Sequence, residues 1–258
     1  MIDIEILKNS LFVIQACRNR MEIVKAYLKR QEPAKIILNN GLQIIGAEGP
    51  LWAARLIFGD EVYNPWNFLI QENDIVVDIG ANIGVFALYA ACKTKNAVYA
   101  YEPSPENFES LVQNIHLNNL DHIHPFRLAV SDKIGTVMFF LSETCEGHMV
   151  YDHIIKGKLE NYINVPAVTL PEIMESNGLE RIDFLKMDCE GQEGAILKST
   201  PGTYLKKVKK IALEFHDALS GYKHQFIQRI LVENNFDTKL IWDGKSHYGY
   251  IYAWNLRY

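Results

Sequence analysis

The stretch VVDIGANIGVF, residues 76–86, constrains the fold of this chain more than any other. It begins as an apolar run that ends in Asp78, and a turn that contains Gly80 and Gly84 follows at once. A short apolar run bounded by a glycine turn is typical of a buried strand, and the apolar residues after Gly84 continue as a helix. A strand, a glycine-rich turn and a helix in this order bring backbone N–H groups close to a bound ligand. The stretch therefore predicts an α/β fold with a nucleotide site, and it leaves the nucleotide open.

From residue 74 onward, runs typical of strands alternate with runs typical of helices, which is the pattern of a parallel α/β sheet. We expect strands at residues 75–79, 97–102, 123–130, 183–188 and 208–215. We expect helices at about residues 83–93, 104–119, 170–177, 191–199 and 218–234.

Three further strands are expected outside this alternation. TVMFFL (136–141) is one, and DTKLIW (237–242) and YGYIYAW (248–254) are two more with a Gly-Lys-Ser turn between them. Two consecutive strands at the end of the pattern indicate one antiparallel member in an otherwise parallel sheet.

The first 30 residues have a helical period that ends before Pro33. The apolar residues that this period places on one face are Leu7, Leu11, Ile14, Cys17, Met21, Val24 and Leu28. Three interpretations stay open: a helix packed on the main domain, a contact between two copies, or attachment to a membrane surface through nearby lysines and an arginine. Those basic residues are Lys25, Lys29 and Arg30.

A hairpin and a short helix are predicted next. Asn40 and Gly41 lie between two β-rich runs, which is a strong short-range hairpin signal. A short helix is expected in LWAARLIFG (51–59). Residues 1–70 are therefore interpreted as an accessory lid or brace, not an independent domain, and residues 71–258 as the nucleotide-binding domain.

Composition excludes several classes of protein. The chain of 258 residues is 48% hydrophobic and 22% charged, as in ordinary globular proteins, and its net charge of −5 gives no support for a nucleic-acid partner. No apolar run approaches the length that spans a bilayer, and the first residues lack a basic signal-peptide head. The four cysteines are scattered without metal-ligand spacing, which fits a reducing compartment. We expect a cytoplasmic protein.

The glycine turn also carries information about the cofactor. A site for NAD or FAD would read G-x-G-x-x-G, but Asn82 stands where the middle glycine would be. Asp78, two residues before Gly80, is poorly suited to a pyrophosphate and well suited to a cation. S-adenosylmethionine carries both a sulfonium and an ammonium group, so this charge argument favours it without deciding.

A second acid follows the next strand, in YEPSPENF (101–108). Glu102 can accept hydrogen bonds from both ribose hydroxyls of an adenosine cofactor, and the alternative is a surface glutamate at a strand end. Ser104 is a natural N-cap, Pro105 a natural first helical residue, and Asn107 is expected to face the cofactor. The predicted cofactor site comprises Asp78, Gly80, Ala81, Asn82, Gly84, Glu102, Pro103, Ser104, Asn107 and Ala129.

Acids and a histidine end the two later strands. FLKMDCEGQEGAI (184–196) supplies Asp188, Glu190 and Glu193, and IALEFHD (211–217) supplies Glu214 and His216. Ligands in open α/β sheets bind beyond the carboxyl ends of the strands, so these side chains are expected to converge beside the cofactor. For Glu193 the alternative is stabilisation of a helix N-terminus, and for His216 a histidine at a sheet edge without a chemical role.

Six segments in order resemble one family: VVDIGANIGVFALYAA, YEPSPENFESLVQNIHLNN, LAVSDKIGTVMFF, VTLPEIM, IDFLKMDCEGQEGAIL and ALEFH. The chain resembles the FkbM family of S-adenosylmethionine-dependent methyltransferases over about residues 40–256. The resemblance implies a Rossmann-like fold whose seven-stranded sheet ends in an antiparallel strand. It also implies O-methylation of hydroxyls, commonly on sugars or polyketides, and it does not explain residues 1–30.

The hypothesis for the reaction is in-line transfer of a methyl group to a substrate hydroxyl. An alcohol is a weak nucleophile, so a base is expected to assist. Asp188 and His216 are the candidate bases, and Glu190 and Glu214 are expected to tune or orient them. The same four residues could ligate Mg²⁺, but no compact ligand motif supports a metal, and none is assigned.

Two alternatives from other classes stay open. An NAD-dependent sugar oxidoreductase would share Glu102 and the glycine turn, although Asp78 and the missing G-x-G-x-x-G motif argue against it. The other alternative is a cofactor-binding scaffold without catalysis, in which the N-terminal helix assembles partners. The density of acids around Asp188 makes scaffolding alone a weaker interpretation.

The methyl acceptor is the least constrained element. We expect a small molecule or a glycan, free or linked to a carrier. Residues 143–166 form a long connection that is expected to cap it. The residues predicted to touch the acceptor are His148, Tyr151, His153 and Glu193. The alternative is a surface loop whose histidines have no role in binding. LKKVKK (205–210) is interpreted as a solvated strand flank, or as a contact for a phosphate-linked or membrane-borne acceptor.

Overall fold

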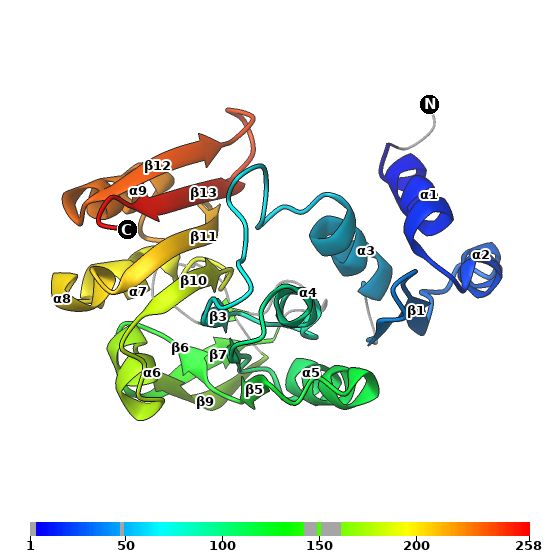
Figure 1. The fold of residues 1–258 in the computed structure, drawn as a ribbon, viewed down its shortest axis with the longest axis horizontal. Coiled ribbons are helices and arrows are strands. Elements are labelled where there is room, and N and C mark those ends of the chain that lie inside the picture. Colours follow the sequence, from blue (N-terminus) through cyan, green and yellow to red (C-terminus); the bar gives the residue numbers. More distant parts are fainter. Residues whose placement is uncertain (1–3, 47–48, 142–148, 151–160) are drawn as a thin grey trace.

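The computed structural model describes residues 4–46, 49–141, 149–150 and 161–258. Its centre is a seven-stranded sheet whose spatial order is β12-β13-β11-β10-β3-β4-β5 (Figure 1). The strands are β3 (Val76–Ile79), β4 (Val98–Tyr101), β5 (Ile123–Phe126), β10 (Ile182–Met187), β11 (Val208–His216), β12 (Phe236–Ile241) and β13 (Tyr248–Asn255).

The strand directions confirm the predicted fold class. The pairs β10–β11, β10–β3, β3–β4 and β4–β5 are parallel, whereas β13 runs antiparallel to both β11 and β12. The order reverses between β3 and β10, because the chain first builds outward to β5 and then returns to the other side of β3. Ligands in such sheets bind beyond the strand ends at this reversal.

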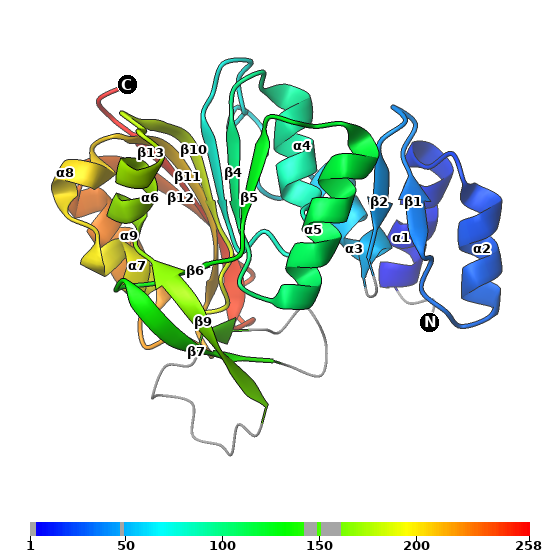
Figure 2. The same cartoon turned by 90° about the horizontal axis from the view of Figure 1, so that it is seen from below.

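Helices cover both faces of the sheet, as Figure 2 shows. One face carries α4 (Val85–Lys93) and α5 (Pro105–Asn118). The other face carries α6 (Leu170–Ser176), α7 (Glu193–Ser199), α8 (Gly202–Leu205) and α9 (His224–Glu233). Because both faces are covered, the central strands are apolar without alternation, and every residue of β3 and β10 is buried.

A second, four-stranded sheet lies at the edge of the domain, in the order β6-β9-β7-β8. Its strands are β6 (Ala129–Val130), β7 (Gly135–Phe140), β8 (Met149–Val150) and β9 (Tyr162–Val168). The predicted single strand at 123–130 is therefore wrong, because its last two residues leave β5 to pair with β9. The connection expected at 143–166 is also too long, since β9 begins at Tyr162 and its residues alternate between the small core of this sheet and solvent.

The N-terminal segment differs most from expectation. It forms two helices, α1 (Ile4–Ala16) and α2 (Arg20–Leu28), and the chain between them pairs Cys17 with Leu38. The side chains buried here belong to Phe12, Val13, Cys17 and Ile23. Most of the predicted apolar face is instead exposed: Leu7, Leu11, Ile14, Met21, Val24 and Leu28. The predicted stripe is thus exposed on both helices, and α1 packs on the domain through Phe12 and Val13, which lie beside the stripe in sequence.

The predicted hairpin is present as β1 (Lys35–Ile37) and β2 (Gln43–Ile45). Two asparagines of α5 form hydrogen bonds with the backbone at the outer edge of this hairpin. Asn118 and Asn114 each accept a hydrogen bond from a backbone N–H of β2, at Gln43 and Ile45, and each donates to the carbonyl oxygen of the same residue. The side-chain amides thus replace a neighbouring strand, which would otherwise be needed to satisfy these backbone groups.

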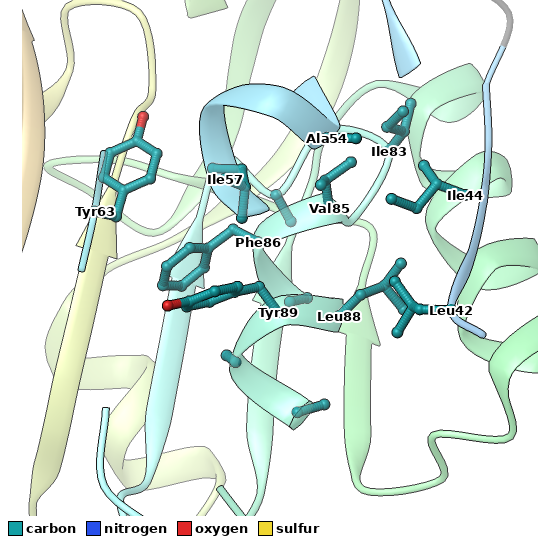
Figure 3. Packing of buried hydrophobic residues seen from close by; sticks show 14 of the residues in the cluster. Leu42, Ile44, Ala54, Ile57, Tyr63, Ile83, Val85, Phe86, Leu88 and Tyr89 are labelled. Carbon is teal, nitrogen blue, oxygen red and sulfur yellow. The ribbon is translucent and has the colours of Figure 1, made fainter. Parts of the chain in front are cut away.

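One hydrophobic core joins the N-terminal segment to the main domain. Leu42 and Ile44 of the hairpin and Ala54 of α3 (Pro50–Ala54) lie beside Val85 and Leu88 of α4 (Figure 3). The π-helix η1 (Arg55–Gly59) directly follows α3. In the part of the chain that the structure describes, no helix is both long and apolar enough to cross a membrane.

Candidate functional site

A cavity of about 840 Å³ opens beyond the carboxyl ends of the central strands, within the size range of small-molecule sites. It is lined by residues that directly follow β3, β4 and β10, and by the last residues of β11. The predicted site residues on its wall are Gly80, Asn82, Glu102, Pro103, Asn107, Ala129, Asp188, Glu190, Glu214 and His216. The fold therefore brings the predicted cofactor and catalytic residues to one cavity.

The glycine turn is held tightly against the neighbouring strand end. Gly80 has a positive φ of 74°, and a Cβ atom there would lie 1.8 Å from the carbonyl oxygen of Asp188. The backbone N–H groups of Gly80 and Ala81 both donate to the carbonyl oxygen of Tyr101, at 3.0 Å. Any side chain at position 80 would separate β3 from β10, so glycine is required for packing as well as for conformation.

Glu102 organises the adenosine end of the predicted site. Its carboxylate accepts hydrogen bonds from the backbone N–H groups of Asn82 and Ser104, each at 2.8 Å. Burial raises the pKa of Glu102 to about 7 even though these bonds favour its ionised form. A carboxylate has about four lone-pair sites, so Glu102 keeps acceptor capacity for ligand hydroxyls.

The remaining predicted cofactor residues shape the turn and the following helix. Ser104 caps α5 by accepting from the backbone N–H of Asn107, and Asn107 lies on the cavity wall. Gly84 has a φ of 89° and lies against Leu111, so it permits close packing of α4 on α5. Ala81 and Gly84 lie outside the cavity wall.

Asp78 is placed differently from the prediction. It is completely buried and lies behind the cavity wall, where its Oδ1 atom is 3.0 Å from Nζ of Lys186. The register of β10 against β3 sets Lys186 directly beside Asp78.

Lys186 also donates to the carbonyl oxygen of Gly80 at 2.6 Å, and lies 3.9 Å from Asp188 Oδ2. Burial would lower the pKa of Lys186, but the two aspartates raise it, so the lysine is charged. Asp78 therefore supports the turn through a buried ion pair and is not positioned to touch a cofactor.

Three carboxylates, those of Asp188, Glu190 and Glu214, and the imidazole of His216 lie together on the cavity wall. Nε2 of His216 lies 3.4 Å from Oε2 of Glu190 and 4.0 Å from Oε1 of Glu214. Burial would lower the pKa of His216, but the acids Glu193, Glu190 and Asp188 raise it to about 10. Burial raises the pKa of Glu190 to about 8 and, together with Asp188, that of Glu214 to about 7.

These pKa values change the predicted role of His216. With a pKa near 10 the imidazole is protonated at neutral pH in the ligand-free protein, so it cannot accept a proton there. The carboxyl groups of Glu190 and Glu214 titrate close to neutral pH, which is the property that a general base requires.

Glu193 supports the loop that carries Glu190. It is completely buried, and its carboxylate accepts hydrogen bonds from the backbone N–H groups of Cys189 and Gly191. Its Oε1 atom is 3.5 Å from Nδ1 of His216. The expected contact of Glu193 with a substrate is therefore wrong, because its side chain faces away from the cavity into the loop. Glu190 itself has a φ of 52°, an uncommon conformation for a residue with a side chain.

Tyr63 completes the group and was not predicted. Its hydroxyl oxygen lies 2.8 Å from Oδ2 of Asp188 and 3.0 Å from Oε2 of Glu214. Tyr63 is buried and comes from the segment between η1 and β3, so the N-terminal part of the chain reaches into the site.

Among the described residues, one set of side chains has the spacing of a metal site. One ligand atom each from Asp188, Glu193 and His216 lies within 4.8 Å of the other two. This set differs from the one considered from sequence, in which Glu190 and Glu214 took the place of Glu193. The predicted acceptor contacts His148, Tyr151 and His153 lie outside the residues that the structure describes.

Comparison with known proteins agrees with this geometry. Residues 78–252 match the profile of the family described as Methyltransferase FkbM domain. The match covers more than half of the chain. It includes Glu102 and the acid segment that follows β10, and it begins after α1, α2, α3 and Tyr63.

Two curated proteins illustrate the similarity. The hexuronic acid methyltransferase AglP of Haloferax volcanii is 26% identical over 170 residues, which are 66% of this chain and 66% of that protein. The 31-O-demethyl-FK506 methyltransferase FkbM of Streptomyces tacrolimicus is 25% identical over 194 residues, which are 63% of this chain and 73% of that protein.

A solved structure shares the fold. The crystal structure of Methyltransferase FkbM from Methylobacillus flagellatus matches with a TM-score of 0.50 and 16% identity. The match covers 79% of this chain and 53% of that one, so this chain spans about half of the longer protein.

Proposed function

Because the chain belongs to the FkbM methyltransferase family, we propose that it uses S-adenosylmethionine to methylate a hydroxyl group of a sugar or a related metabolite. Two relatives support this choice of acceptor. AglP is named for a hexuronic acid, which is a sugar, and the Streptomyces relative for a product methylated at oxygen.

One observation carries the proposal: the cavity has an acceptor for ribose hydroxyls at one place and a surplus of acids at another. Glu102 supplies the first, and Asp188, Glu190 and Glu214 supply the second. Among the ion pairs that the structure describes around these acids, the positively charged partners are His216 and the buried Lys186. When bound, S-adenosylmethionine supplies a sulfonium-linked methyl group and a second cationic centre, so its charge complements this end of the cavity.

The chain's own residues have distinct roles in this proposal. Glu102 orients the adenosine through its remaining lone pairs. Glu190 accepts the hydroxyl proton of the acceptor, since its carboxylate lies on the cavity wall and its pKa of about 8 matches that task. His216 holds Glu190 in place and stays positively charged, while Glu193 fixes the loop.

Calorimetric titration tests the cofactor. S-adenosylmethionine and S-adenosylhomocysteine are expected to bind, and NAD is not. Glu102→Gln is expected to weaken binding of both adenosyl compounds by about tenfold, because one acceptor becomes a donor. Tight binding of NAD with no binding of S-adenosylmethionine would instead support an oxidoreductase.

Methyl transfer tests the reaction. Labelled S-adenosylmethionine, incubated with the protein and a panel of glycans, is expected to label a hydroxyl that mass spectrometry can locate. Glu190→Gln is expected to lower kcat by about 10²–10⁴-fold and to weaken S-adenosylmethionine binding by a much smaller factor, because one of the acids beside the cation is lost. Glu106→Gln, an exposed acid in the first turn of α5, is the matched control. Normal turnover in the Glu190 variant would remove this residue from the proposed step.

A further inference from the structure

Part of the cavity wall comes from the N-terminal segment, before the start of the family match at residue 78. α1 contributes Lys8 and Asn9, α3 contributes Trp52, and η1 contributes Arg55. We call these four residues the N-terminal wall. The helices α1 and α3 lie toward one end of the molecule, and β11 and β13 toward the other, in both overall views (Figures 1 and 2).

The N-terminal wall and the acid group differ in charge. The cavity lining from the N-terminal segment includes two cationic side chains, Lys8 and Arg55, and one anionic one, Asp60. The lining from the main sheet includes four acids against one histidine, and these acids are Glu102, Asp188, Glu190 and Glu214. Among the lining residues, the N-terminal side therefore carries a net positive charge and the sheet side a net negative one, which grows as Glu102, Glu190 and Glu214 ionise above about pH 7.

Arg55 is built into its place. Although charged, it is buried, its Nε donates to Oδ1 of Asn9 at 2.7 Å, and its guanidinium pairs with Asp60. Phe12 packs directly against Gly59 and so holds α1 on η1. The guanidinium is therefore already bonded to a carboxylate of the same wall, and it presents a ligand carboxylate or phosphate with a positioned charge of fixed geometry, not with an unpaired one.

Trp52 adds an aromatic surface to the same wall. Its side chain is 42% exposed although it lines the cavity, and it comes from a helix whose other face is buried in the core. Tyr248 at the start of β13 lines the cavity too, and is also exposed. An exposed aromatic ring in a cavity offers a flat apolar face with polar groups nearby, which suits the C–H face of a sugar ring.

We propose that the N-terminal wall is the acceptor subsite, and that it selects a sugar carrying an anionic group, a carboxylate or a phosphate. This inference rests on the proposed function. The acids around Glu190 repel such a group, while Lys8 and Arg55 attract it. The anion thus sets which end of the sugar lies at the N-terminal wall, and leaves a hydroxyl directed toward the acids. Electrostatic complementarity of this kind fixes orientation more than it raises affinity.

Binding of three matched probes tests the proposal without methyl transfer. Phenyl glucoside, phenyl glucuronide and phenyl glucoside 6-phosphate share the ring and the aglycone, and differ at one carbon. Calorimetry is run on the full chain with and without S-adenosylhomocysteine. We expect at least one anionic probe to bind about tenfold or more tightly than the neutral one, with an advantage that shrinks in added salt. The tighter of the two anionic probes tells carboxylate from phosphate.

Two variants link this preference to the wall. Lys8→Gln, at an exposed position, is expected to reduce the anionic preference about threefold or more without affecting folding. Trp52→Ala is expected to weaken all three probes alike. Lys25→Gln, the same change at an exposed position of α2 outside the cavity, is the matched control and is expected to change nothing.

The outcomes separate this inference from the proposed function. Equal affinity for neutral and anionic probes, a preference that Lys8→Gln leaves intact, or no binding of any probe would overturn the subsite. None of these results depends on S-adenosylmethionine binding, which the titrations against NAD decide. A protein that selects the anionic probe but ignores S-adenosylmethionine would retain the subsite and refute the methyltransferase proposal.

Discussion

The hydroxyl oxygen of Tyr63 lies 2.8 Å from Oδ2 of Asp188, although 125 residues separate the two in sequence. The same oxygen is 3.0 Å from Oε2 of Glu214. A phenol has one hydrogen, so it can donate to only one of these carboxyl groups at a time. Glu214, whose pKa is raised to about 7, can carry a proton and donate it back to Tyr63. The N-terminal segment thereby joins the acids that end β10 and β11.

Tyr63→Phe is expected to shift the acid side of the pH–rate profile to lower pH, because a Glu214 that is protonated more often raises the pKa of the proposed base Glu190 less. The hydroxyl bond lowers the pKa of Glu214, so its removal raises that pKa above about 7. The ring is retained, along with its edge-to-face contacts with Phe86 and Tyr250. The free energy of unfolding is expected to fall by about 1–3 kcal/mol, as for a bond to a charged group. Rate measurements from pH 5 to pH 9 and thermal unfolding check both effects.

Tyr204→Phe is the control for this change. Tyr204 is partly exposed and lies outside the cavity wall, and its hydroxyl donates a hydrogen bond to Glu175. Its removal is expected to leave the pH–rate profile unmoved. If Tyr63→Phe likewise moved neither limb, the bridge between Asp188 and Glu214 would have no part in setting their protonation.

Neither Tyr63 nor Lys186 could be identified as a site residue from sequence. Tyr63 comes from an irregular segment with no periodicity, and only the shared core places that segment over the strand ends. Lys186 could have been noticed in the sequence, because it is a lysine inside the apolar run IDFLKM. A charge in a buried strand requires a partner. The register that makes Asp78 this partner, however, is a property of the assembled sheet.

The sequence was sufficient to place residues at strand ends beside the cavity, because strand order and direction alone determine where those ends lie. Glu102, Asp188 and Glu214 reach one cavity as soon as the strands are parallel and adjacent. What sequence could not decide is which way each side chain points. Asp78 and Glu193 follow the same pattern, yet both are buried behind the cavity wall.

The N-terminal helices illustrate a different limit. The helical period is real, but the stripe that it predicts is exposed on α1 as well as on α2, and α1 packs through Phe12 and Val13 instead. Periodicity indicates a helix, but it does not decide which face the rest of the fold covers. The first helix also ends just before Cys17, which pairs with Leu38 beside the hairpin, and no window of helical periodicity contains that contact.

Gly80→Ala is expected to destabilise the protein severely, by about 3 kcal/mol or more, because the new Cβ would overlap the carbonyl oxygen of Asp188 at 1.8 Å. Gly178→Ala is the matched control. Gly178 also has a positive φ, 63°, but no atom lies within 4 Å of the added Cβ, so only the conformational cost of about 1–2 kcal/mol applies. Urea unfolding compares the two variants. Equal losses would mean that β3 and β10 can separate at this point without cost.

Stability of the ligand-free protein is expected to fall as pH rises from 6 to 9. Glu102, Glu190 and Glu214 have pKa values of about 7 to 8 when folded, above 4.5, and His216 has about 10, above 6.5. The folded state therefore binds more protons than the unfolded state across this range, and the free energy of unfolding decreases with pH. The melting temperature is expected to fall by about 5 °C or more.

The lowered pKa of Glu193 does not oppose this trend, because it acts only below pH 4.5. Glu190→Gln removes one of the raised carboxyl groups and is expected to reduce the fall between pH 6 and pH 9. A melting temperature that rises over this range in the unmodified chain would show that the acids are ionised without penalty, and that the cavity is better solvated than its burial indicates.

Binding of S-adenosylmethionine at pH 7 is expected to release protons. A cation beside Glu190 and Glu214 favours their ionised forms, and hydroxyl donors beside Glu102 do the same, so each pKa falls on binding. Since these groups titrate at about 7 to 8, part of their population carries a proton that must leave. Calorimetry in phosphate and in Tris, which differ in ionisation enthalpy, measures the number released.

S-adenosylhomocysteine provides the control, because it keeps the adenosine and the ammonium group but lacks the sulfonium charge. It is expected to release fewer protons than S-adenosylmethionine, and the difference is expected to shrink in Glu190→Gln. Equal release by both compounds would place the sulfonium away from the acids, since a charge that approaches Glu190 must alter its protonation. Proton uptake would contradict the assignment of these carboxyl groups to the cationic end of the cofactor.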